Sequence, residues 1–211
     1  MLALWMAMVM QAQSRKAALF TGWMFGVGHF VISLNWIAKA FTFQAAMPEW
    51  LGYVAVVLLS LYLAVFPALA ALGGWWIGKN RPTGFVFALA GMWIVTEWLR
   101  SWVFSGFIWS PLGTVALPLG RTADLSMFIG SYGLSAILFA GAGSLWLLFE
   151  KKWKAALPLM LIFAGLSVIP GHTIKKISND QPLITVVQPN IGQQDKWQAG
   201  YEEQNLAKLA Q

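Results

Sequence analysis

Long apolar runs separated by short polar connections dominate this chain. A helix needs roughly 20 mostly apolar residues to cross about 30 Å of hydrocarbon. Five runs approach or exceed that length, at residues 17–37, 50–77, 84–102, 123–149 and 153–169. A sixth run, residues 1–10, reaches only about 15 Å as a helix and is expected to be the second half of a span. The pattern predicts a membrane α-helical bundle of five full spans plus a partial N-terminal one, within residues 1–170.

Composition supports a membrane protein and excludes several other classes. Of the 211 residues, 58% are hydrophobic and 10% are charged, against about 25% charged in an ordinary soluble domain. Mean hydropathy is +0.64. So few charges could not cover a soluble globule of this apolar content, and a disordered chain is excluded. The sequence has no cysteine, which excludes a disulfide-stapled domain, a thiolate metal site and a cysteine nucleophile within it.

The basic residues indicate topology rather than a nucleic-acid partner. Net charge is +6, but the lysines and arginines form small clusters between apolar runs instead of a stripe, and no nucleic acid is expected to bind. Three short connections carry seven of the fourteen: Arg15, Lys16, Lys79, Arg81, Lys151, Lys152 and Lys154. The positive-inside rule places these connections in the cytoplasm and the stretch after residue 169 outside the membrane.

One apolar stretch is not expected to be a continuous helix. Residues 102–120 read WVFSGFIWSPLGTVALPLG and are interrupted by three glycines and two prolines. Irregular backbone at membrane depth persists only where it is buried in protein or lines a cavity. We expect a re-entrant or interfacial loop on the outer side, forming a wall of a lipid-accessible pocket. The alternative is an ordinary apolar outer loop.

Three polar residues lie at the expected outer ends of the spans. Glu97 and Arg100 are three residues apart on one helical face and can pair. Their role is either to form an ion pair that fixes the outer loop or to contact the substrate. Asn35, at the end of the first full span, is costly in lipid unless it is hydrogen-bonded, so we expect it to bind the same outer region.

No reaction can be derived from the residues alone. The two histidines, His29 and His172, cannot form a metal cluster without cysteine, so neither a metal nor another cofactor is expected. We expect His29 to make an interhelical hydrogen bond. A nucleophile elbow, a P-loop and a dinucleotide fingerprint are absent from the sequence.

The C-terminal stretch differs from the spans. Residues 171–181 read as a polar linker, and residues 182–211 as the first strand and helix of an α/β domain. The strand is expected at residues 183–187, a β-branched run, and the helix at residues 201–209. Since one strand and one helix cannot bury a core, we expect this domain to be truncated.

Three strings resemble the bacterial apolipoprotein N-acyltransferases. They are GWMFGVGHFVISLNWIAKAF at residues 22–41, TEWLRSWVFSGFIWSPLG at 96–113 and ITVVQPNIGQQDKWQ at 184–198. The resemblance implies a multi-pass enzyme of the bacterial inner membrane with a nitrilase-like domain in the periplasm. It also implies a phospholipid acyl donor and a diacylglyceryl lipoprotein acceptor.

The resemblance implies substrate-contacting residues but no catalytic ones in this chain. The family's Glu–Lys–Cys triad would lie beyond residue 211. Trp197 matches a family tryptophan that lines the active-site cavity, and Phe107 and Trp109 match the outer loop near it. Glu97, Arg100 and Asn35 would be structural residues close to that cavity.

Two other functions remain open at this stage. One is a non-enzymatic membrane subunit or a transporter-like bundle, although the spans hold almost no midplane charge. The other is a related nitrilase-type membrane enzyme with a different acyl acceptor.

Overall fold

A computed structural model describes residues 1–42, 48–118, 122–168, 186, 188, 191 and 199–209 of the chain. Within these residues every regular element is a helix. The elements are α1 (Leu2–Met10), α2 (Arg15–Ser33), α3 (Asn35–Phe41), α4 (Glu49–Leu63), α5 (Val65–Gly78), α6 (Pro82–Arg100), η1 (Val103–Ser105), η2 (Leu112–Ala116), α7 (Thr122–Phe149), α8 (Trp153–Val168) and α10 (Glu202–Leu209).

The helices coincide with the predicted apolar runs, although fewer than five meet the length of a full span. Among the described residues, three helices are long and apolar enough: Glu49–Gly78, which joins α4 to α5, Pro82–Arg100 and Asp124–Phe149. A fourth forms if α2 and α3, bent by 47° at their junction, count as one span. At the fifth predicted position lies α8, whose apolar part Trp153–Leu166 is shorter than the length required of a full span.

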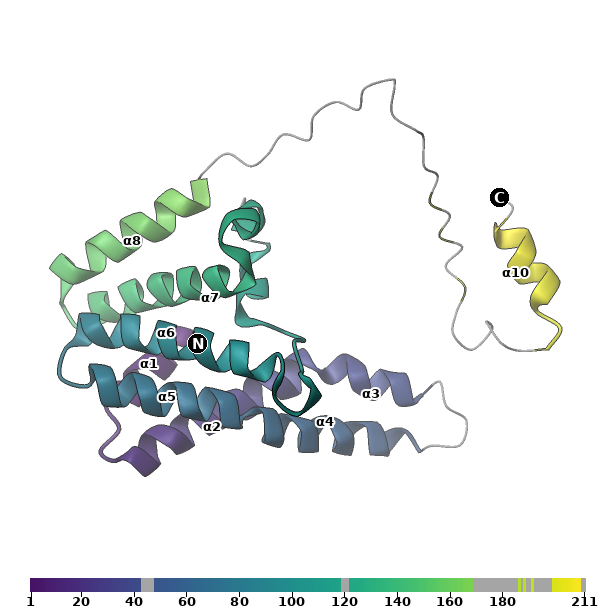
Figure 1. Ribbon diagram of the computed structural model, residues 1–211, viewed down its shortest axis with the longest axis horizontal. Coiled ribbons are helices and arrows are strands. Elements are labelled where there is room, and N and C mark those ends of the chain that lie inside the picture. Colours follow the sequence, from purple (N-terminus) through teal and green to yellow (C-terminus); the bar gives the residue numbers. More distant parts are fainter. Residues whose placement is uncertain are drawn as a thin grey trace, which may run out of the picture.

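The longer helices lie side by side, and α1 packs against α2 and α7 (Figure 1). α5 pairs with α6 and with α2, while α7 packs between α6 and α8. Trp5 of α1 is 4% exposed and stacks on Phe25 with ring centroids 4.4 Å apart. It also meets Trp93 and Phe139 edge to face. Aromatic rings from four helices therefore form the centre of the bundle.

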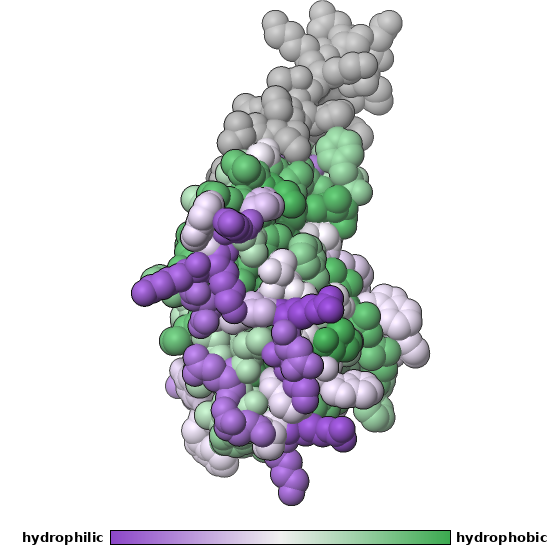
Figure 2. All heavy atoms as spheres, turned by 90° about the vertical axis from the view of Figure 1, so that its left-hand side faces the viewer, coloured by the Kyte–Doolittle hydropathy of each residue, from purple (hydrophilic) through white to green (hydrophobic). Residues whose placement is uncertain are grey.

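The three short basic connections lie at one end of the bundle. Between α1 and α2, α5 and α6, and α7 and α8, the chain turns at the same end, where Figure 2 shows hydrophilic side chains gathered. Local signals fit these turns. The Ser14 hydroxyl accepts a hydrogen bond from the Ala17 amide at 3.2 Å, and Pro82 occupies the first turn of α6.

In the C-terminal stretch, the predicted helix at residues 201–209 is confirmed as α10 (Glu202–Leu209). The linker at residues 171–181 lies outside the described residues, and so does the strand predicted at 183–187, except Val186.

Candidate functional site

The loop that was expected on the outer side begins where α6 ends at Arg100 and continues to residue 118. As predicted, it is not a continuous helix, since only the short η1 and η2 are regular. Phe104, Gly106 and Ser110 have φ values of 52°, 79° and 57°. A left-handed conformation is uncommon for a bulky residue such as phenylalanine, and it persists only when the surrounding structure imposes it.

Arg100 holds the first half of this loop. Its side chain is 4% exposed, and its Nη1 donates to the Phe107 carbonyl at 3.0 Å and to the Trp109 carbonyl at 2.8 Å. The guanidinium also lies over the Phe30 ring, 5.1 Å from its centroid. A positive charge over an aromatic face is attracted by the ring's negative face. Arg100 thus joins the loop backbone to α2.

Glu97 holds the second half, where η2 begins. Its side chain is 5% exposed, and Oε1 accepts from the Leu112 amide at 2.7 Å. Its Oε2 accepts from the Ser135 hydroxyl at 2.9 Å, and that hydroxyl accepts from the Gly113 amide at 2.9 Å. The first amides of a helix have no intrahelical partner. Glu97 and Ser135 therefore cap η2 from two other helices.

The structure thus gives Glu97 and Arg100 separate partners in one loop, and it records no ion pair between these two side chains. Asn35 lies exposed at the start of α3, with no side-chain hydrogen bond recorded in the described part of the chain. Its neighbour Trp36 makes the contact with the loop, since its ring lies 5.3 Å from that of Trp109.

Phe107 and Trp109 lie on the side of the loop that faces α2, α3 and α4. Phe107 is half-buried and packs against the apolar cluster of Phe30, Leu34, Ala38, Val56, Leu63 and Phe66. Trp109 is 60% exposed, and Trp36 beside it is 51% exposed. Two amphipathic indoles therefore face the surroundings, one from α3 and one from a loop backbone that Arg100 holds in place.

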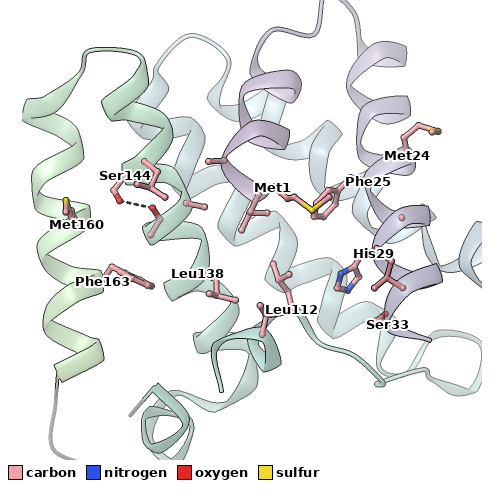
Figure 3. A pocket seen from close by; sticks show the side chains of 18 residues that line it. Met1, Met24, Phe25, His29, Ser33, Leu112, Leu138, Ser144, Met160 and Phe163 are labelled. Atoms are coloured by element: carbon pink, nitrogen blue, oxygen red, sulfur yellow. Dashed lines mark hydrogen bonds between the residues drawn. The ribbon is translucent and has the colours of Figure 1, made fainter. Parts of the chain in front are cut away.

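A separate apolar cavity of about 800 Å³ lies on the other side of the loop (Figure 3). Residues of α1, α2, α7 and α8 line it, for example Phe25, Leu138 and Phe163. The loop contributes Leu112 and Val115 to this wall, whereas Phe107 and Trp109 do not line it.

His29 is the one titratable side chain in that wall. Its Nε2 lies 3.5 Å from the Ser110 carbonyl, a long contact in which the ring nitrogen donates if it carries the proton. The imidazole also stacks on Phe25 with centroids 6.3 Å apart. The polar contact of His29 is thus with the loop after α6, rather than the expected hydrogen bond to another helix.

Sequence reasoning missed Ser135, which α7 places beside Glu97, because nothing distinguishes it from other small residues in that span. Trp197 and His172 lie outside the described residues. In the part of the chain that the structure describes, His, Asp and Glu side chains form no group of three that could hold a metal.

The fold and the loop define a class of protein: a polytopic helical bundle that fits a membrane and carries an ordered apolar loop at one end. Comparison with known proteins identifies the family. The family model described as "Apolipoprotein N-acyltransferase N-terminal domain" matches residues 1–144. The chain belongs to the apolipoprotein N-acyltransferase family.

Curated relatives named apolipoprotein N-acyltransferase agree with this assignment. The protein of Shewanella oneidensis is 31% identical over 207 residues, which cover 93% of this chain and 38% of the relative. The protein of Allorhizobium ampelinum is 34% identical over 188 residues, covering 86% of this chain and 35% of the relative. The protein of Ralstonia nicotianae is 32% identical over 218 residues, which cover 95% of this chain and 39% of the relative. The chain thus spans less than two fifths of these relatives.

Proposed function

We propose that these residues form the membrane part of an apolipoprotein N-acyltransferase. The whole protein would transfer an acyl chain from a phospholipid to the α-amino group of the N-terminal diacylglyceryl-cysteine of lipoproteins. It would lie in the bacterial inner membrane with the stretch after residue 169 in the periplasm. The bundle would comprise five full spans, with α8 as the fifth, and residues 182–211 would begin the nitrilase-like domain.

The observation that carries this proposal is the ordered apolar loop after α6. Its backbone is held by buried charged side chains, while Trp109 and Phe104 are 60% and 82% exposed. An indole combines an apolar body with a polar N–H, which suits the boundary between acyl chains and headgroups. A loop of this kind can receive a lipid from the bilayer and exclude water from it.

In this scheme the described residues bind and orient the donor. Phe107 and Trp109 would contact the acyl chain or the headgroup, and Trp197 would line the same site. The family's cysteine thiolate would take the acyl group from the phospholipid ester oxygen, releasing the lysophospholipid. The lipoprotein amine would then attack the thioester and release the thiolate. The cysteine, with the glutamate and lysine of the family triad, would come from residues beyond 211.

The first prediction concerns activity. The whole protein, purified in detergent with phospholipid, should acylate a diacylglyceryl-cysteine peptide, with the mass of the peptide rising by one acyl group. Residues 1–211 alone should transfer nothing, because the thiolate nucleophile is missing from them. Mass spectrometry of the peptide checks both results. Absence of transfer by the whole protein, or thioester formation on the 211-residue chain, would contradict the proposal.

The second prediction concerns orientation. Seven basic residues in three connections at one end favour the cytoplasm for that end. Alkaline phosphatase fused after Ile177 should therefore be active, because it folds only in the periplasm. The same enzyme fused after Lys152 should be inactive. A fluorescent protein that folds only in the cytoplasm should give the opposite pair of results, and bright fluorescence after Ile177 would overturn the orientation.

A further inference from the structure

We propose that Arg100 is a positioning residue for the acyl-donor site, acting on Phe107 and Trp109 through their backbone carbonyls, with Glu97 and Ser135 holding the far end of the loop. This inference rests on the proposed function. It assigns the two buried charges of α6 to the geometry of the loop and not to substrate or to the chemical step.

The loop depends on these side chains for several of its backbone hydrogen bonds. A carbonyl or amide without a partner at membrane depth costs several kcal/mol. Between residues 107 and 113, two carbonyls bind Arg100 and two amides bind Glu97 and Ser135. Backbone groups of four of these seven residues are thus satisfied by side chains of α6 and α7.

The two carbonyls that Arg100 binds lie close together. A single nitrogen, Nη1, donates to both the Phe107 and Trp109 carbonyls, so these carbonyls must converge on one point. The next residue, Ser110, has a φ of 57° in the left-handed region, which is strained for a residue other than glycine. The hydrogen bonds to Arg100 offset this strain and fix the direction in which Trp109 leaves the backbone.

The Arg100 side chain is enclosed and does not reach the surface where a lipid would lie. It is 4% exposed and lies over the Phe30 ring. The space that Arg100 shares with Phe66, Trp93 and Glu97 is a void of about 10 Å³, which holds one water at most. A group enclosed in this way can orient the loop but cannot touch a donor lipid.

The absence of cysteine from the sequence allows a direct test of this role in the 211-residue chain. Ile108 lies between the two bound carbonyls and is 64% exposed, so Ile108→Cys provides a single site for a nitroxide spin label. In lipid nanodiscs the label should be strongly immobilised. Arg100→Met should raise its mobility several-fold, and Arg100→Lys should restore part of the order, because an ammonium can still donate to a carbonyl.

Two controls separate loop release from general unfolding. Arg81→Met removes an exposed arginine at the opposite end of the same helix and should leave the label unchanged. A label at Leu58→Cys on α4, which is 61% exposed, should stay immobile in Arg100→Met. If Arg100→Met fails to fold, Glu97→Gln/Arg100→Met removes both buried charges together and should still free the label at 108.

Kinetics of the whole protein then test the link to the donor. Arg100→Met should raise KM for phospholipid about tenfold and leave KM for the diacylglyceryl peptide unchanged. A loss of folded enzyme would instead lower kcat with both KM values unchanged. An immobile label in Arg100→Met, or equal rises in both KM values, would overturn the inference. Absence of transfer by the wild-type protein would overturn the proposed function instead, and the label would still report on the loop.

Discussion

Gly22→Ala is expected to destabilise the bundle by about 2–3 kcal/mol, although alanine is the better helix former. A Cβ at this position would lie 2.5 Å from the Ala71 Cβ and 2.7 Å from the Pro67 carbonyl oxygen. Both groups belong to α5, and neither can turn away, because one is backbone and the other a methyl on the helix. The α2 and α5 helices would have to separate, and overpacking of this kind costs about 1–3 kcal/mol.

Gly28→Ala on the same helix is the matched control. A Cβ there would meet nothing within 4 Å. Gly28→Ala should therefore stabilise the bundle through the higher helix propensity of alanine, by up to about 1 kcal/mol. Thermal unfolding of the two variants in one detergent, followed by circular dichroism, should therefore shift the midpoint in opposite directions. Equal shifts would mean that α2 and α5 do not approach as closely as the structure has them.

The length and apolar character of the runs are enough to predict most helices. The predicted runs at 84–102 and 123–149 correspond to the helices Pro82–Arg100 and Asp124–Phe149. A helix satisfies the hydrogen bonds of its own backbone, and its ends lie where the sequence changes from apolar to polar. The 47° bend between α2 and α3 was not predicted, since neither proline nor glycine marks it. Over its described residues, α8 does not meet the length of a full span by itself.

The candidate site was predictable only where a side chain stood out from its surroundings. Glu97 and Arg100 are charges in an apolar run, and this contrast singled them out. Their partners are backbone groups of residues 107–112, and every residue type carries such groups, so the sequence holds no signal for the pairing. Ser135 had no signal either, because a serine in a span more often bonds to its own helix.

Asn35 and Trp36 are a second case in which the sequence did not predict which side chain contacts the loop. An asparagine at the end of a span suggested a hydrogen bond, while a tryptophan there suggested only an interfacial anchor. The bend at Leu34 instead turns Trp36 towards Trp109. Local sequence does not encode the direction in which a bend points a side chain, and the contact follows from that direction.

Glu97→Ala is expected to lower the free energy of unfolding by about 3–5 kcal/mol. Truncation leaves the Leu112 amide and the Ser135 hydroxyl without their acceptor, and it leaves Arg100 as a buried charge with no carboxylate nearby. A buried hydrogen bond to a charged group contributes about 1.5–3 kcal/mol, and Glu97 accepts two such hydrogen bonds.

Glu97→Gln separates the two contributions. Its carbonyl oxygen can still accept from the Leu112 amide, so the cap on η2 survives while the charge is lost. We expect Glu97→Gln to lower the free energy of unfolding, but by less than Glu97→Ala does. Thermal unfolding in detergent under identical conditions measures both variants. Glu49→Ala, which removes an exposed carboxylate from the first turn of α4, should cost less than about 1 kcal/mol. If Glu97→Ala costs no more than Glu49→Ala, the loop does not depend on Glu97, and the account of how buried side chains hold it is wrong.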